Sequence, residues 1–263
     1  NQTELLFFNN ALKSSYFINY LFNFKEVLFE LLYPSQNFQM MLDLISKIKL
    51  KKMSNLQIGL VFSDFSQNLF EIYNSTIFSS FRIDSSIHFI PERSFYNFSS
   101  LKSISIPFSI TEIGSESFRG CSSLYSILIP SSVTVIGNYA FSECISIVNI
   151  SIPSSVIKIG DYIFSGCSSL VNVTIPSSIT EIPSHAFENC SSLRHVIAPS
   201  SLIKTIGDYS FNKCLLLTEI SIPSSVVKIG KNAFYKCSIK ELQIPSSVTE
   251  IGMGTFEYSP LRK

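Results

Sequence analysis

Charge and long apolar runs are both scarce in this chain of 263 residues. Only 15% of the residues are charged and the formal net charge is +1, whereas 46% are hydrophobic. Such a small net charge argues against an extended nucleic-acid or anionic-membrane footprint, and so much apolar material argues against a disordered chain. The longest candidate membrane helix, residues 16–33, is interrupted by Lys25, Glu26 and Glu30. We therefore expect no direct membrane insertion of this segment and no nucleic-acid partner.

Residues arranged for catalysis are also missing. The chain has three histidines, His88, His185 and His195, and no paired Cys-x-x-Cys spacing of the kind that holds zinc. It has no Gly-x-Ser-x-Gly sequence that would expose a serine nucleophile. We therefore predict a protein that is not an enzyme, with no cofactor and with no catalytic or metal-binding residues.

One phrase returns about every 23 residues. Residues 129–144 read IPSSVTVIGNYAFSEC, and residues 152–167 read IPSSVIKIGDYIFSGC. A proline column and a cysteine column keep the same period, and a phenylalanine stands three places before each cysteine. The two columns are Pro107, Pro130, Pro153, Pro176, Pro199, Pro223 and Pro245, and Cys121, Cys144, Cys167, Cys190, Cys214 and Cys237. So many columns in phase predict stacked structural repeats.

Each repeat begins like a short strand and continues into a turn. In residues 101–107, LKSISIP, Ile104 and Ile106 share one strand face and the intervening serines share the other. Leu101 would point to the opposite face if the strand continued back to it. We therefore expect its side chain to enter the interior from a bend before the strand. Proline then ends the strand because it has no N–H to continue a ladder. The serine two residues later can satisfy backbone groups of the turn.

The second half of the repeat carries a further apolar pair, such as Val133 and Ile136, which we expect to point inward. The next column is glycine in most repeats but proline in two of them. Because proline cannot adopt a positive φ, we predict that these glycines serve close packing. The polar residue that follows, Asn138 or Asp161 for example, is suited to cap a short helical turn that carries Phe and Cys inward.

A single repeat cannot hold its own fold. About seven inward apolar side chains contribute about 1.5–3 kcal/mol each when buried, whereas ordering the backbone costs about 1–2 kcal/mol per residue. Stacked units bury both faces of every coil, so the sequence predicts a solenoid with a parallel sheet along one side. In such a stack the six cysteines form a column beside the buried phenylalanines. We interpret them as structural thiols, with disulfide bridges and metal binding as the alternatives.

The pattern Leu-x-x-Ile-x-Ile-Pro-Ser-Ser-Val-x-x-Ile-Gly-x-x-Ala-Phe-x-x-Cys resembles the 23-residue repeat of BspA-like leucine-rich-repeat proteins. The match covers residues 87–263, with one extra residue within 202–206, one fewer near Ile239, and Phe98 in the cysteine column. The resemblance implies an α/β leucine-rich-repeat solenoid, with a parallel β-sheet along one face and short helical turns opposite. Members of this family occur on bacteria and parasitic protists, often as surface proteins that act in adhesion and bind host or matrix proteins.

Two domains follow from these patterns. Residues 86–263 are predicted to form a solenoid of seven to eight coils, and residues 1–85 a mostly helical capping module. Apolar stripes at helical spacing between Leu12 and Leu32 and from Phe38 to Ile48 indicate helices, and residues 56–62 alternate like a strand. Residues 38–50 also resemble a degenerate BTB-type adaptor segment. The chain begins without methionine and stops within a repeat, so we expect a fragment or a processed product.

The surface expected to bind a partner is the outward row of the sheet, called here the sheet-face row. It is small and polar at one end and acidic at the other, and repeat solenoids commonly bind through such extended faces. Its first coil carries Ser103 and Ser105. Its predicted binding residues are Ser126, Leu128, Asn149, Ser151, Asn172, Thr174, His195, Ile197, Glu219, Ser221, Glu241 and Gln243.

We therefore predict a protein-binding repeat protein, at the cell surface or secreted, whose partner is a host or matrix protein or a glycoprotein. Leu128, His195 and Ile197 are the candidate anchors. An intracellular scaffold or adaptor, in which residues 1–85 and the repeats bind different proteins, is the alternative. Six Asn-x-Ser/Thr sequons include Asn149 and Asn172 in the sheet-face row, and we expect most of them to be unused.

Overall fold

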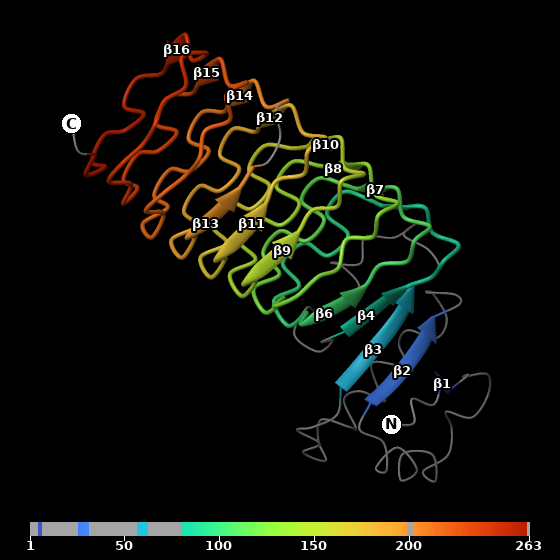
Figure 1. The fold of residues 1–263 in the computed structure, drawn as a ribbon. Coiled ribbons are helices and arrows are strands. Elements are labelled where there is room, and N and C mark those ends of the chain that lie inside the picture. Colours follow the sequence, from blue (N-terminus) through green and yellow to red (C-terminus); the bar gives the residue numbers. More distant parts are fainter. Residues whose placement is uncertain (1–4, 7–25, 32–56, 63–79, 199–201, 262–263) are drawn as a thin grey trace.

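The chain forms a stack of coils that runs from the blue end of Figure 1 to the red end. The computed structural model describes residues 5–6, 26–31, 57–62, 80–198 and 202–261. Within these residues every strand pair is parallel, and the repeats make about seven turns of a solenoid. The resulting fold is a parallel β-solenoid.

The first strands of the coils lie in one row, along the lower side of the stack in Figure 1. The row consists of a five-stranded sheet, in the order β1-β2-β3-β4-β6, and a three-stranded sheet, in the order β13-β11-β9. Asn172 of β11 pairs with Asn149 of β9 and with His195 of β13, so the register advances by one repeat per strand. The strands are β1 (Leu5–Leu6), β2 (Glu26–Leu31), β3 (Gln57–Phe62), β4 (Ser80–Ile83), β6 (Ser103–Ser105), β9 (Asn149–Ser151), β11 (Asn172–Thr174) and β13 (His195–Ile197).

A second row of two-residue strands lies along the opposite, upper side of the stack in Figure 1. It consists of the sheets β10-β8-β7-β5 and β12-β14-β15-β16. Each strand includes the second residue of the apolar pair, such as Ile136, which is buried as predicted. The strands are β5 (Phe89–Ile90), β7 (Glu112–Ile113), β8 (Val135–Ile136), β10 (Lys158–Ile159), β12 (Glu181–Ile182), β14 (Thr205–Ile206), β15 (Lys228–Ile229) and β16 (Glu250–Ile251).

The predicted α/β class with short helical turns is wrong, because the described residues contain no helix. The turns that carry Phe and Cys inward send alternate amides to the next coil. The N–H of Tyr139 donates to the carbonyl of Asp161 (2.9 Å) and that of Phe141 to the carbonyl of Ile163 (3.0 Å). An α-helix would need these donors for its own carbonyls four residues earlier. Bonding between coils therefore replaces bonding within a turn.

The expected caps act between coils as well. The Oδ1 of Asn138 accepts the N–H of Asp161, and the Oδ1 of Asp161 accepts the N–H of Ser184, both at 3.0 Å. Positive φ angles at residues such as Tyr139 (56°) and Glu143 (61°) turn the chain sharply within each coil. Such angles cost non-glycine residues about 1–2 kcal/mol each, and the bonds to the next coil hold the residues there.

The helical prediction for the N-terminal module is also wrong where the structure describes it. Residues 26–31, part of the first predicted stripe, form β2, which pairs in parallel with β3 over six registers. A short apolar run such as EVLFEL does not distinguish a helix from a buried strand. The strand predicted over 56–62 is confirmed by β3. The rest of the first stripe and all of residues 38–50, which include the second stripe, lie outside the described residues. The boundary at residue 85 stays a prediction.

A ladder of phenylalanine rings forms the centre of the stack. Consecutive rings from Phe95 to Phe256 stack with centroids 5.2–5.7 Å apart and interplanar angles of 1–18°. All but the last of these rings are fully buried. Leu101 is also fully buried, as predicted. The turn serines link coils through their hydroxyls, as when the Oγ of Ser155 donates to the carbonyl of Val133 at 2.7 Å. The rings thus contact their own copies one repeat away, and the serines bond to the backbone of a neighbouring coil.

The recurrent glycines serve close packing, as predicted. A Cβ on Gly160 would lie 2.4 Å from the backbone nitrogen of Asn138 in the preceding coil, where no side chain fits. Positive φ angles occur instead at Gly120, Gly166 and Gly254 among the described glycines. The two kinds of glycine therefore have different physical roles.

The cysteines are buried and free, and each thiol donates to a backbone carbonyl of a neighbouring coil. The Sγ of Cys167 lies 3.1 Å from the carbonyl oxygen of Phe141, and the other five make the equivalent bond. In the last coil Ser259 takes this position, and its Oγ donates to the carbonyl of Phe234 at 2.7 Å. A small side chain that donates to a carbonyl thus occupies this column from Cys121 to Ser259, whereas the buried ring of Phe98 occupies it in the first repeat. Burial raises the pKa of Cys167 to about 12, so the thiol keeps its proton in the folded protein.

Two glycines of one repeat give a matched test of this packing. Gly160→Ala should lower the free energy of unfolding by about 3 kcal/mol, because backbone must move to admit the methyl group. Gly166→Asn should cost less than about 1 kcal/mol, since Asn tolerates left-handed backbone and Asn189 already occupies the same column at a φ of 59°. Urea unfolding followed by circular dichroism measures both, and equal losses would contradict the assignment.

The thiol ladder predicts an order of stability among variants of Cys167. Cys167→Ser should be more stable than Cys167→Ala, because the hydroxyl retains the bond to the Phe141 carbonyl. Alanine leaves that carbonyl with only the N–H of Cys144 (3.3 Å) as a donor, and the loss of one hydrogen bond costs about 0.5–1.5 kcal/mol. Denaturant midpoints of the two variants decide the point, and an alanine variant at least as stable as the serine variant would refute it.

The same burial predicts a loss of stability in alkali. Unfolded thiols lose their protons near pH 9, whereas folded Cys167 and Cys237 hold theirs to about pH 12. Between these values the unfolded state binds fewer protons, so the free energy of unfolding falls as pH rises, by up to about 1.4 kcal/mol per pH unit for each thiol. Unfolding titrations between pH 8 and pH 10 measure the slope. Cys167→Ser should have a shallower slope than the parent protein, and identical slopes would exclude the thiol as a source.

Candidate protein-binding face

The sheet-face row lies on the surface at every predicted position. All twelve side chains, from Ser126 to Gln243, are exposed, while the residues between them point into the stack. Two members of the row are apolar: Leu128 is 77% exposed and Ile197 is 57% exposed. The geometry thus provides a continuous outward face with two apolar points, and its role in binding stays a prediction.

The middle of the row is the most regular part. Asn149, Asn172 and His195 lie in register on β9, β11 and β13, as do Ser151, Thr174 and Ile197. The Nδ2 of Asn172 donates to the Oδ1 of Asn149 at 2.8 Å, so the two sequon asparagines contact each other. This side-chain bond fixes the polar centre of the face.

Elsewhere the row departs from the expected sheet. Residues 126–128, 219–221 and 241–243 reach the same side of the stack but form no strand in the described structure. At 126–128 the coil remains closed, because Ile127 and Ile129 stay buried. The two later segments instead border a groove.

This groove has a volume of about 720 Å³ and lies at the acidic end of the row. Six predicted binding residues line it together with inward side chains of the same coils. We call it the C-terminal groove. Its lining is His195, Val196, Ile197, Glu219, Ile220, Ser221, Ile222, Glu241, Leu242, Gln243, Ile244 and Pro245. The sequence predicted the six outward-facing residues of this lining but did not predict a groove.

A second surface feature follows the left-handed turns and was missed by the sequence analysis. The rings of Tyr139, Tyr162, His185 and Tyr209 stack with centroids 4.1–4.7 Å apart. The Nδ1 of His185 lies 2.6 Å from the Oε2 of Glu188. The signal was present in one column of the repeat, two residues after Gly137, Gly160, Pro183 and Gly207, where each residue is aromatic. These contacts join neighbouring coils, so a structural role accounts for them.

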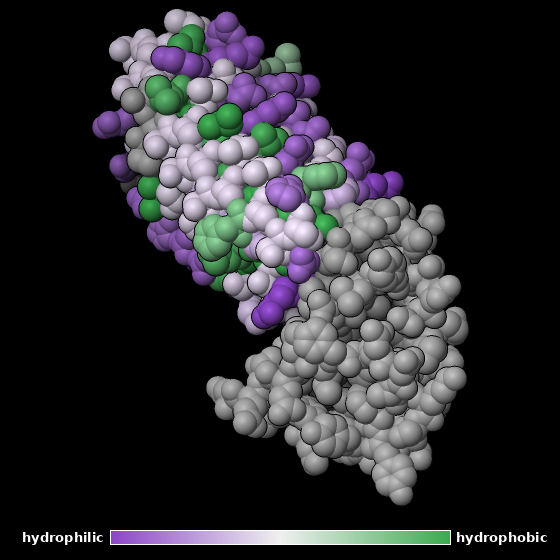
Figure 2. All heavy atoms as spheres, turned by 90° about the vertical axis from the view of Figure 1, so that its right-hand side faces the viewer, coloured by the Kyte–Doolittle hydropathy of each residue, from purple (hydrophilic) through white to green (hydrophobic). Residues whose placement is uncertain are grey.

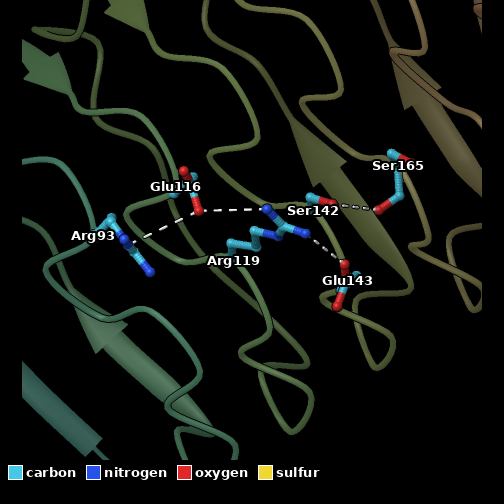
Figure 3. Close-up of polar contacts among 6 residues, drawn as sticks. All are labelled: Arg93, Glu116, Arg119, Ser142, Glu143 and Ser165. Atoms are coloured by element: carbon cyan, nitrogen blue, oxygen red, sulfur yellow. Dashed lines mark hydrogen bonds and ion pairs between the residues drawn. The ribbon is translucent and has the colours of Figure 1, made fainter. Parts of the chain in front are cut away.

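Charged side chains extend this turn surface toward the N-terminal coils, as Figure 3 shows. Glu116 lies 4.0 Å from Arg93 and 3.4 Å from Arg119, and Arg119 lies 3.2 Å from Glu143. Burial lowers the pKa of Arg119, but the hydrogen bond and charge of Glu143 outweigh it and raise the pKa overall. Each charge is thus partnered along the stack rather than directed at a ligand.

The described residues offer no candidate site for a metal ion. They contain no group of three or more His, Cys, Asp or Glu side chains placed to hold a metal ion. The described part of the chain also has no helix long and apolar enough to cross a membrane. On the side drawn in Figure 2, hydrophobic side chains form small separated patches among hydrophilic ones.

This parallel solenoid with an exposed sheet face is a leucine-rich-repeat architecture. The family described as "BspA type Leucine rich repeat region (6 copies)" matches residues 48–148 and 134–262. The chain belongs to this family. Comparison with curated proteins yields no match.

Solved structures from bacteria share the architecture. A leucine-rich repeat protein from Bacteroides ovatus ATCC 8483 is 34% identical with a TM-score of 0.65, over 75% of this chain and 49% of that one. The chain thus spans about half of that protein. The Treponema protein titled "T. pallidum Leucine Rich Repeat protein (TpLRR)" is 28% identical with a TM-score of 0.53, over 70% and 78% of the two chains. A leucine-rich repeat protein from Eubacterium ventriosum ATCC 27560 is 21% identical with a TM-score of 0.59, over 80% and 61%, and shows the fold alone.

Proposed function

We propose that the chain is the recognition region of a surface or secreted adhesion protein that binds a host or matrix protein through the sheet-face row. The observation that carries this proposal is the unbroken exposure of that row together with its two uncovered apolar side chains, Leu128 and Ile197. Exposed apolar side chains bordered by polar ones can serve as contact points for a protein partner. The surface role rests on the family to which the chain belongs.

The row offers a partner more than scattered contacts. Neighbouring strands lie about 4.8 Å apart, so the side chains from coil to coil form a rigid lattice. A rigid surface loses little conformational entropy on binding. The polar centre of the row and the acidic C-terminal groove offer different chemistry at two places on one face. This difference favours one orientation of the bound partner.

Replacing His195 and Ile197 together with alanine should weaken partner binding by about tenfold or more, because two central contacts are removed. Surface plasmon resonance against a panel of purified extracellular-matrix proteins measures the effect, with circular dichroism to confirm folding. A matched control is His88→Ala with Ile157→Ala, since both side chains are exposed and lie off the row. Equal affinities of the two double variants would remove His195 and Ile197 from the site, and no binding to any matrix protein would contradict adhesion.

The cellular compartment separates this proposal from an intracellular adaptor. Protease treatment of intact cells should remove the repeats if they face outward, whereas a cytosolic protein is protected. Intact-mass analysis of native protein adds a second criterion, because a glycan on Asn149 or Asn172 excludes the cytosol. Both asparagines are exposed.

A further inference from the structure

The stack opens at its C-terminal end. In the inward column of the first strand row, Ile104, Ile127, Ile150 and Val173 are at most 7% exposed. The next three members of the column, Val196, Ile220 and Leu242, are only partly buried, and Ile244 is 43% exposed. Apolar side chains that belong to the core in other coils therefore form the floor of the C-terminal groove.

The backbone opens at the same place. No hydrogen bond joins residues 219–221 to β13 or to residues 241–243 among the described residues, although these segments lie in successive coils. The period changes there as well, with one extra residue within 202–206 and one fewer near Ile239. The ladder of the first row stops at β13, while the second row continues through β14, β15 and β16.

The last strand of the sheet presents a free edge to this groove. The N–H of His195 and the carbonyl of Ile197 bond toward β11, to Val171 (3.2 Å) and Ile175 (2.8 Å). Backbone groups alternate in direction along a strand, so the N–H and carbonyl of Val196 face the groove. No described residue bonds to them. An open edge of this kind can pair with an added strand.

The charge of the groove is one-sided. Glu219 and Glu241 line it, neither has an ion-pair partner among the described residues, and none of the lining residues is Lys or Arg. Lys240 precedes Glu241 in the chain but lies outside the lining. A ligand with positive side chains is the electrostatic complement of this surface.

We propose that the C-terminal groove binds an extended segment of a partner protein, in which lysine or arginine alternates with aliphatic residues. The segment pairs its backbone with the free edge at Val196, rests its aliphatic side chains on Ile220 and Leu242, and places its cations against Glu219 and Glu241. Alternation suits an extended chain because successive side chains point to opposite sides. This inference rests on the proposed function and names the class of segment recognised at the acidic end of the row.

The test uses hexapeptides and the whole chain. Acetylated, amidated Lys-Val-Lys-Val-Lys-Val is titrated into ¹⁵N-labelled protein, and amide shifts are followed by NMR. We expect saturable shifts at residues 195–197, 219–222 and 241–245, and affinity that falls with added salt. Peptides with Glu in place of Lys, or Ser in place of Val, should bind at least tenfold more weakly. Strand pairing with a single edge uses only one of the two sets of N–H groups, those of the lysines or those of the valines. N-methylation of the set that pairs should therefore weaken binding at least tenfold.

Charge reversal locates the site. Glu219→Lys with Glu241→Lys should weaken the lysine peptide by about tenfold or more. The control, Glu112→Lys with Glu181→Lys, changes the net charge equally on the second strand row and should change affinity less than twofold. Equal losses in both double variants, shifts outside the groove, or affinity unaffected by either N-methylation would overturn the proposal.

The peptide result is separable from the proposed function. Binding of a matrix protein that depends on His195 and Ile197 but is not displaced by the lysine peptide would leave the recognition face standing and overturn the groove's role. Peptide binding at the groove without any matrix partner would support the groove and contradict adhesion.

Discussion

The backbone hydrogen bond between neighbouring coils is the interaction on which the rest of this solenoid depends. In the strand rows and in the turns, amides of one coil donate to carbonyls of a neighbouring coil, as when the N–H of Gly160 donates to the carbonyl of Ile136 in the preceding coil at 2.9 Å. These bonds leave few groups for a helix within the coil. They also fix the separation of the coils, so each side chain must fit against its counterpart one repeat away.

This constraint explains why the columns are so uniform. Phenylalanine rings stack on phenylalanine rings, thiols bond to carbonyls of a neighbouring coil, and Asn172 bonds to Asn149. Where Ser259 replaces a cysteine, its hydroxyl donates to the carbonyl of Phe234 as the thiols do in their coils. Glycine recurs where backbone of one coil approaches another too closely for any Cβ.

Function belongs to the parts of the coil that this constraint leaves free. Outward side chains of the first strand row make no contribution to the core and can vary, which is why the row changes from small and polar to acidic along the stack. The C-terminal groove arises where the spacing of the repeat changes and the ladder stops. The end of the strand ladder thus exposes the apolar floor of the groove together with unpaired backbone groups of β13. An extended peptide can use both.

The sequence by itself determined the period, the division into inward and outward columns, and the packing role of the glycines, because these follow from spacing, parity and the fixed φ of proline. Only the tertiary structure decided that the turns are not helical, that a second strand row covers the opposite side, and that β2 is a strand. These depend on whether an amide bonds within its own coil or to the next. The groove was beyond the sequence for the same reason: a one-residue change of spacing marks a place where register can shift, but whether the coils close or part there depends on contacts between them.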